Sequence, residues 1–295
     1  MGYLFLAISL FCGKAKGYCG KKTSTYINSL TDAITANVIR MALCVILGLF
    51  FMLLSKDFSD GIRSTEFFLI ALLSGISNAC FVVSWLIAVQ KNAYLLLDVF
   101  LMMSILVPLL CSQLFFGESV KLLQWLGLLI LLIATFFMCL YNNSIKPTLS
   151  WRGLLLLTFC GLSNGIADFS QKLFTARIPQ GSASYFNFYT YLFAVAVLLI
   201  VLWVLRTKQQ EPSCLNGKKI LLPIVFMAIF LFLNSYFKTL AAARLSAVHL
   251  FPLNQGGSLI LSFFMSYALF QEKPNGKAIC AIILAFIGLC IIHMV

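Results

Sequence analysis

Long apolar stretches follow one another along almost the whole chain, with only short polar connections between them. A helix needs roughly 20 apolar residues to cross the hydrocarbon core of a bilayer. The mean hydropathy of +0.99 is too high for a water-soluble domain, and the connections leave no room for a separate one. The sequence therefore predicts an all-α polytopic membrane protein with ten transmembrane helices, at residues 2–18, 33–54, 67–88, 94–116, 122–141, 153–173, 184–205, 220–243, 248–270 and 278–294.

Charge and cysteine content exclude several other classes of protein. The formal net charge is +12, but the Lys and Arg residues are scattered over helix ends and connections, so we expect no nucleic-acid interface. Most of the ten cysteines lie inside apolar stretches and none forms a CxxC pair, which predicts neither a metal site nor a disulfide framework. The apolar stretch from Gly2 to Phe11 follows no basic segment, and we interpret it as a transmembrane helix rather than a cleaved signal.

The sequence gives little sign of catalysis or of nucleotide hydrolysis. It contains no HExxH or GxxxxGK[ST] pattern, and its two histidines, His249 and His293, are far apart. A GxSxG pattern occurs once, from Gly161 to Gly165, but it lies inside the helix expected at 153–173 rather than at a turn from a strand to a helix. We therefore expect no enzymatic activity, no cofactor and no direct use of ATP.

An internal repeat divides the chain into two halves. A shift of 154 residues superposes the segment from Phe116 to Glu118 on that from Phe270 to Glu272. The same shift, or a slightly smaller one near the start of each half, aligns Ala88 with Ala242, Ser104 with Ser258, Lys21 with Lys172, and Asn37 with Asn187. Because each half holds five helices, the second must enter the membrane from the opposite face. The repeat therefore predicts an inverted-topology pair, residues 1–145 and 146–295.

These residues resemble the drug/metabolite transporter superfamily, in its ten-helix type with two EamA-like domains. The resemblance is carried by an apolar helix, a turn that contains Glu, and a closing helix that contains Gly. In the first half these are Pro108, the turn at Phe116-Gly117-Glu118, and Gly127; in the second they are Ser258, Phe270-Gln271-Glu272, and Gly288. Two positions depart from the pattern, Gln271 in place of Gly117 and Ala281 in place of Gly127. The resemblance implies a transporter but leaves the solute open, since the superfamily handles amino acids, nucleotide sugars, purines, cations and drugs.

The helix expected at 153–173 carries the densest set of polar residues. A charge at membrane depth needs a cavity or a partner, so each one indicates a candidate site. Residues on this face, or alongside it, are Gly161, Asn164, Gly165, Asp168, Gln171 and Lys172. One interpretation is a pocket wall, in which Asp168 and Lys172 contact the solute or exchange a proton. The other is an ion pair between these two residues beside a glycine packing seam.

Two further helices carry special segments at corresponding positions of the halves. Tyr94 and Asp98 lie in the opening turns of the helix at 94–116, where Asp98 is either a buried carboxylate suited to proton coupling or a helix-start carboxylate at the interface. The helix at 248–270 contains Pro252, Asn254, Gln255, Gly256 and Gly257, which predicts a loosened helix and, with His249, a second pocket candidate.

The remaining candidates are Asn234 and Lys238 on one face of the helix at 220–243, and Trp85 in the helix at 67–88. Lys238 has the alternative of extending its ammonium group to the membrane interface. Glu118 and Glu272 are expected to cap the helices that follow them, without contacting solute.

The leading functional prediction is a secondary transporter that moves a small metabolite or drug-like solute by alternating access, coupled to protons or working by exchange. The alternatives are a flippase for a lipid-linked substrate and a structural membrane subunit that does not transport. The expected partners are membrane lipid, a small-molecule solute and protons, with the chain a monomer or homodimer in a bacterial plasma membrane. Orientation stays open, because the excess of Lys and Arg puts both termini outside and the resemblance puts them inside.

Overall fold

The computed structural model describes residues 1–27, 29–55, 64–90, 94–141, 151–208, 217–270 and 276–294. Every regular element in these residues is a helix, so the predicted all-α membrane fold is confirmed. The helices are α1 (Gly2–Ser24), α2 (Leu30–Ser55), α3 (Thr65–Gln90), α4 (Tyr94–Met103), α5 (Leu106–Phe116), α6 (Leu122–Tyr141), α7 (Trp151–Arg177), α8 (Ala183–Lys208), α9 (Gly217–Ala242), α10 (Ala247–Phe270) and α11 (Gly276–His293).

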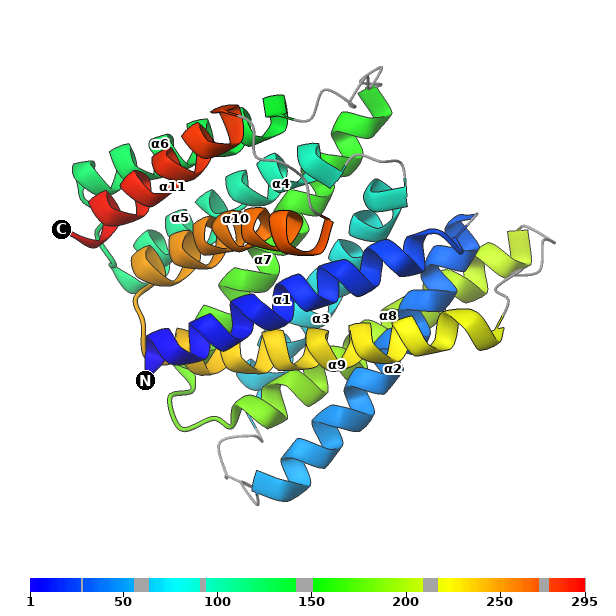
Figure 1. Cartoon of the computed structure of the whole chain (residues 1–295). Coiled ribbons are helices and arrows are strands. Elements are labelled where there is room, and N and C mark those ends of the chain that lie inside the picture. The colour runs from blue at the N-terminus through cyan, green and yellow to red at the C-terminus, as the bar shows by residue number, and fades with distance from the viewer. Residues whose placement is uncertain are drawn as a thin grey trace.

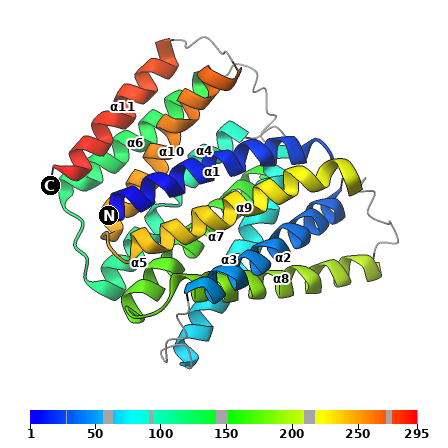
Figure 2. The ribbon, with the colours of Figure 1, turned by 60° about the horizontal axis from the view of Figure 1, so that its bottom comes forward.

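Several helices of the bundle are apolar and long enough to cross a bilayer. Within the described residues, five meet this requirement: α2, α3, α7, α8 and α9; shorter apolar stretches cover 100–116, 122–137 and 279–293. Both chain ends lie at the same end of the bundle (Figures 1 and 2), as an even number of crossings requires.

The layout places two helix pairs at opposite edges and the other helices between them. α6 packs against α11 at one edge, and α2 packs against α8 at the other (Figure 1). In the middle, α1 packs against α9 and α10, and α7 packs against α3, α4 and α5. The centre of the bundle is therefore built from helices of both halves of the chain.

A break separates α4 from α5, where the sequence predicts one continuous helix. Pro108 has no N–H to donate to the carbonyl of Ser104, and its ring crowds that carbonyl. The chain makes tighter turns here: Ile105 N donates to the carbonyl of Met102 (3.2 Å), and Val107 N donates to that of Ser104 (3.2 Å). α4 and α5 are thus two segments of one expected crossing.

α10 is continuous from Ala247 to Phe270, so the prediction of a helix loosened at Asn254 to Gly257 is wrong. Pro252 lies close to the start of α10, where its missing N–H removes a single helical hydrogen bond. The two glycines serve close packing instead. A Cβ on Gly256 would lie 3.0 Å from a methyl of Leu289, and one on Gly257 would lie 3.0 Å from a methyl of Leu10.

α1 extends six residues beyond its expected end at Tyr18, which corrects a second prediction. The connection to α2 was expected at residues 19–32, but it spans only residues 25–29. Lys21 and Lys22 belong to the last turn of α1, where cations interact favourably with the helix dipole. Lys14 and Lys16 consequently lie well inside the helix.

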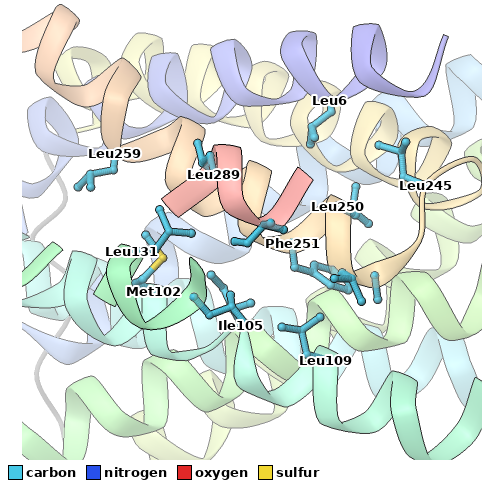
Figure 3. Close-up of a cluster of buried hydrophobic side chains, with 14 of the residues drawn as sticks. Leu6, Met102, Ile105, Leu109, Leu131, Leu245, Leu250, Phe251, Leu259 and Leu289 are labelled. Atoms are coloured by element: carbon cyan, nitrogen blue, oxygen red, sulfur yellow. The ribbon is translucent and has the colours of Figure 1, made fainter. Parts of the chain in front are cut away.

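Apolar side chains of both halves form the core beside α10. Buried Met102, Ile105 and Leu109 from the α4–α5 crossing pack with Leu250 and Phe251 of α10, and helices α1, α6 and α11 add further residues (Figure 3). The break in the α4–α5 crossing therefore lies inside protein, where irregular backbone is tolerated at membrane depth.

Glycines set the spacing of α6 and α11. A Cβ on Gly127 would lie 2.8 Å from the carbonyl oxygen of Gly288, and a Cβ on Gly288 would lie 2.9 Å from that of Gly127. Neither distance is possible for a real Cβ without a backbone shift, so this close contact requires glycine on both helices.

Candidate functional site

A polar cavity of about 100 Å³ lies in the middle of the bundle, between α1, α3, α4, α7, α9 and α10. A neighbouring pocket of about 10 Å³ shares three of its lining residues. The wall of the larger cavity, called the central cavity below, consists of Leu10, Gly13, Lys14, Lys16, Gly17, Phe81, Trp85, Leu101, Asn164, Asn234, Lys238, Asn254, Gln255 and Ser258.

α1 brings two lysines to the central cavity. Lys14 and Lys16 both line the wall, and the ammonium group of Lys16 lies 5.7 Å from the ring centre of Phe81. Gly13 allows α9 to approach, since a Cβ there would lie 3.0 Å from Nδ2 of Asn234. Asn234 in turn donates to the carbonyl of Ser9 (2.7 Å), which fixes α9 against α1.

Lys238 of α9 reaches the central cavity and forms an ion pair with Asp168 of α7. Asp168 is 4% exposed and Lys238 12% exposed, measured on the side chains, so the pair is held away from bulk water. Lys238 therefore does not extend to the membrane interface. The predicted ion pair between Asp168 and Lys172 is wrong, because each residue has a partner on another helix.

Lys172 lies outside the central cavity and joins three helix ends. Its Nζ is 3.3 Å from Oε1 of Glu118 and donates to the carbonyl of Leu245 (2.8 Å) just after α9. Oε2 of Glu118 accepts a hydrogen bond from the backbone N of Ala247 (2.8 Å), the first residue of α10. Glu118 thus caps α10, whereas the sequence predicted that it caps α6, the next helix along the chain. Gly117 ends α5 in a left-handed conformation (φ 64°), and this turn brings Glu118 to the start of α10.

Gly161 and Gly165 bring α7 against the broken crossing. A Cβ on Gly161 would lie 2.7 Å from the carbonyl oxygen of Phe100, and a Cβ on Gly165 would lie 2.7 Å from that of Ser104. Asn164 donates from Nδ2 to Oγ of Ser104 (3.0 Å). The glycines therefore form a packing seam, as one of the two interpretations predicted, while Asn164 beside them lines the cavity.

Comparison with known families decides the class of the second half. Residues 151–294 match the model of the EamA-like transporter family. This half of the chain belongs to that family. A solved crystal structure of a protein is similar over 99% of this chain and 96% of its own, with a TM-score of 0.74 at 14% identity, which shows a shared fold across both halves. No curated protein matches the chain significantly.

The EamA-like half supplies Asn164, Asn234, Lys238, Asn254 and Gln255 to the central cavity, and all five were candidates on sequence grounds. Trp85 of the first half, also a candidate, lines the cavity too. Their role in binding a solute remains a prediction, but the fold does bring these six residues together.

Other candidates lie elsewhere in the structure. Gln171 of the EamA-like half donates to Oγ of Ser235 (3.0 Å), and His249 stacks on His293 with ring centres 4.7 Å apart. Neither side chain lines the central cavity. The side chains of Tyr94 and Asp98 lie outside the described part of the structure.

Lys14, Lys16 and Ser258 line the cavity but were not among the predicted site residues. The first helix was expected to stop at Tyr18, which placed the two lysines near its end rather than in its interior. Their position within an apolar stretch could have identified them, because a lysine inside a membrane helix needs a cavity or a partner. Ser258 follows Asn254 by one helical turn and could have been placed on the same face.

Proposed function

We propose that the chain is a secondary transporter that moves a small solute through the central cavity by alternating access. The observation that carries the proposal is the cavity itself, which lies between three expected crossings of each half and has charged and amide groups in its wall. Buried polar groups at membrane depth are costly unless they serve a solute path or pair with one another. A purely structural subunit has no need of such a cavity.

Helix packing supports two equivalent halves related by an inverted repeat. If the halves are exchanged as the repeat predicts, α1 corresponds to α7, α2 to α8, α3 to α9, the α4–α5 crossing to α10, and α6 to α11. The packing of α1 on α9 then corresponds to that of α7 on α3, and α1 on α10 corresponds to α7 on α4 and α5. The pairs α2–α8 and α6–α11 correspond to themselves, as expected for an inverted repeat.

One pair of aligned residues makes corresponding contacts in both halves. Asn37 donates to the carbonyl of Ala33 (2.9 Å) and to a backbone carbonyl of α3 (3.3 Å). Asn187 donates to the carbonyl of Ala183 (2.8 Å) and to a side-chain hydroxyl of α9 (3.3 Å). These matching bonds favour duplication over a chance alignment of apolar segments.

Transport through the cavity is tested by filling it. Purified protein in lipid vesicles is offered radiolabelled amino acids, nucleosides, organic acids and quaternary amines, as wild type and as Ser258→Phe. The control is Thr158→Phe, which adds the same bulk on the exposed face of α7. We expect saturable uptake of at least one solute, lost in Ser258→Phe and kept in Thr158→Phe. Uptake that survives in Ser258→Phe, or no uptake of any solute, would contradict the proposal.

A further inference from the structure

The charges around Lys16 indicate the class of solute. We propose that the central cavity binds a compact anion, with a carboxylate or phosphate group held by Lys16. The inference rests on the proposed function, because it names the solute class of the same cavity.

Among the described residues, positive charge outweighs negative charge around Lys16. The described groups whose charges act on Lys16 are the cations Arg40, Lys238 and Lys14, and the carboxylate of Asp168. The excess remains when Lys14, which has a further interaction of its own, is left out of the count. The carboxylate of Asp168 is already bonded to Lys238, so it compensates only one cation. Lys16 itself interacts with the ring of Phe81, and a cation–π contact is weaker than a contact with a desolvated anion.

Arg40 provides a second, independent observation. It is 2% exposed, and neither its Nε nor its Nη2 has a hydrogen-bond partner among the described residues. A buried guanidinium is normally paired, because the cost of desolvating its charge must be recovered. Together with Lys16 it creates a positive potential that an entering anion would lower and that an entering cation would raise.

Amide groups complete the wall on the side of α10. Asn254 and Gln255 line the cavity, and neither side chain forms a hydrogen bond to another described residue. Their N–H groups can donate to the oxygens of a carboxylate or phosphate. The wall therefore combines a charged donor on α1 with neutral donors on the facing helix.

The size of the cavity limits the anion. Its volume of about 100 Å³ is well below the roughly 300–1,000 Å³ of sites that enclose drug-sized ligands. The neighbouring pocket of about 10 Å³ has room for about one water molecule. A compact anion fits this space, whereas a nucleotide sugar does not.

The experiment measures the thermal unfolding midpoint in detergent against inorganic phosphate, succinate, leucine and choline at fixed ionic strength. The variants are Lys16→Gln and the control Lys22→Gln, which removes the same charge from an exposed position of the same helix. We expect phosphate or succinate to raise the midpoint of wild type and of Lys22→Gln, and leucine and choline to have no effect. In Lys16→Gln the apparent affinity for the anion should fall at least tenfold. The thermal unfolding midpoint of this variant without anion should rise, because the ammonium group that the neighbouring cations repel has been removed.

Several outcomes would overturn the inference. They are a response to choline or leucine in place of the anions, no response to either anion, or an unchanged anion response in Lys16→Gln. Uptake of labelled anion in vesicles separates this inference from the proposed function. Anion binding without uptake would contradict transport and support the anion site, whereas saturable uptake of a cation or zwitterion alone would support transport and contradict the anion site.

Discussion

Removal of the carboxylate of Asp168 should destabilise the protein by leaving Lys238 without its partner. At a separation of about 4 Å and an effective dielectric constant of about 20, two unit charges attract by roughly 4 kcal/mol. Removing one member of a buried pair typically costs about 3–5 kcal/mol. Lys238 faces the polar cavity, which reduces this cost, so we expect Asp168→Asn to lower the free energy of unfolding by about 2–3 kcal/mol.

A double-mutant cycle isolates the pair. Lys238→Met should cost a similar amount, and the double variant should cost no more than either single variant, because no uncompensated charge remains. The coupling free energy should therefore be about 2 kcal/mol or more. The matched control is Glu66 with Arg177, an ion pair at 3.9 Å whose side chains are about half exposed, and its coupling should stay under about 1 kcal/mol.

The assay is equilibrium unfolding in mixed micelles by SDS titration, followed by circular dichroism. Additive effects of Asp168→Asn and Lys238→Met would refute the reasoning, since they would mean that the two groups do not share a charge interaction. In vesicles Asp168→Asn should also abolish or severely weaken transport while expression stays intact. Unchanged transport would remove Asp168 from the site.

Three further predictions use the same unfolding assay. Glu118→Ala removes the cap of α10 and the ion partner of Lys172, so we expect the free energy of unfolding to fall by about 1–2 kcal/mol. Backbone amides at the start of α10 should also exchange hydrogen faster than in wild type. A fall below about 0.5 kcal/mol would argue against the cap. Gly288→Ala should cost about 1–3 kcal/mol, because its Cβ would meet α6 backbone, whereas Gly276→Ala, with open space around it, should be neutral. Asn187→Ala leaves buried partners unsatisfied and should cost about 1–2 kcal/mol; an unchanged midpoint would contradict its role.

The fold could be predicted from the sequence because hydropathy and helix length are tightly linked in a bilayer. Each expected span overlaps one observed helix, except 94–116, which overlaps α4 and α5. The transporter family found for residues 151–294 agrees with the resemblance of the whole chain. Two local features were not predictable from composition. Pro108 breaks its crossing, whereas Pro252 does not break α10, and the difference follows from position within the helix rather than from residue type.

The candidate site could be predicted only in part. Amides such as Asn164 and Asn254 were identified because a polar side chain in an apolar membrane helix is costly unless it faces a cavity or a partner. The partners of charged residues could not be predicted, since Asp168, Lys172 and Glu118 pair across helices that are distant in sequence. Asp168 and Lys172 lie one helical turn apart, which suggested that they pair with each other. In the folded chain each has a partner on another segment, Lys238 for Asp168 and Glu118 for Lys172.

Two-sided access to the central cavity is the most direct test of the account. In a cysteine-free background, Ser258→Cys is exposed to an impermeant charged thiol reagent, first outside and then inside the vesicles. Ser170→Cys, buried in α7 away from the cavity, is the control. The account predicts that Ser258→Cys is labelled from both sides and that Ser170→Cys is labelled from neither. Labelling of Ser258→Cys from only one side, or from none, would contradict alternating access through this cavity.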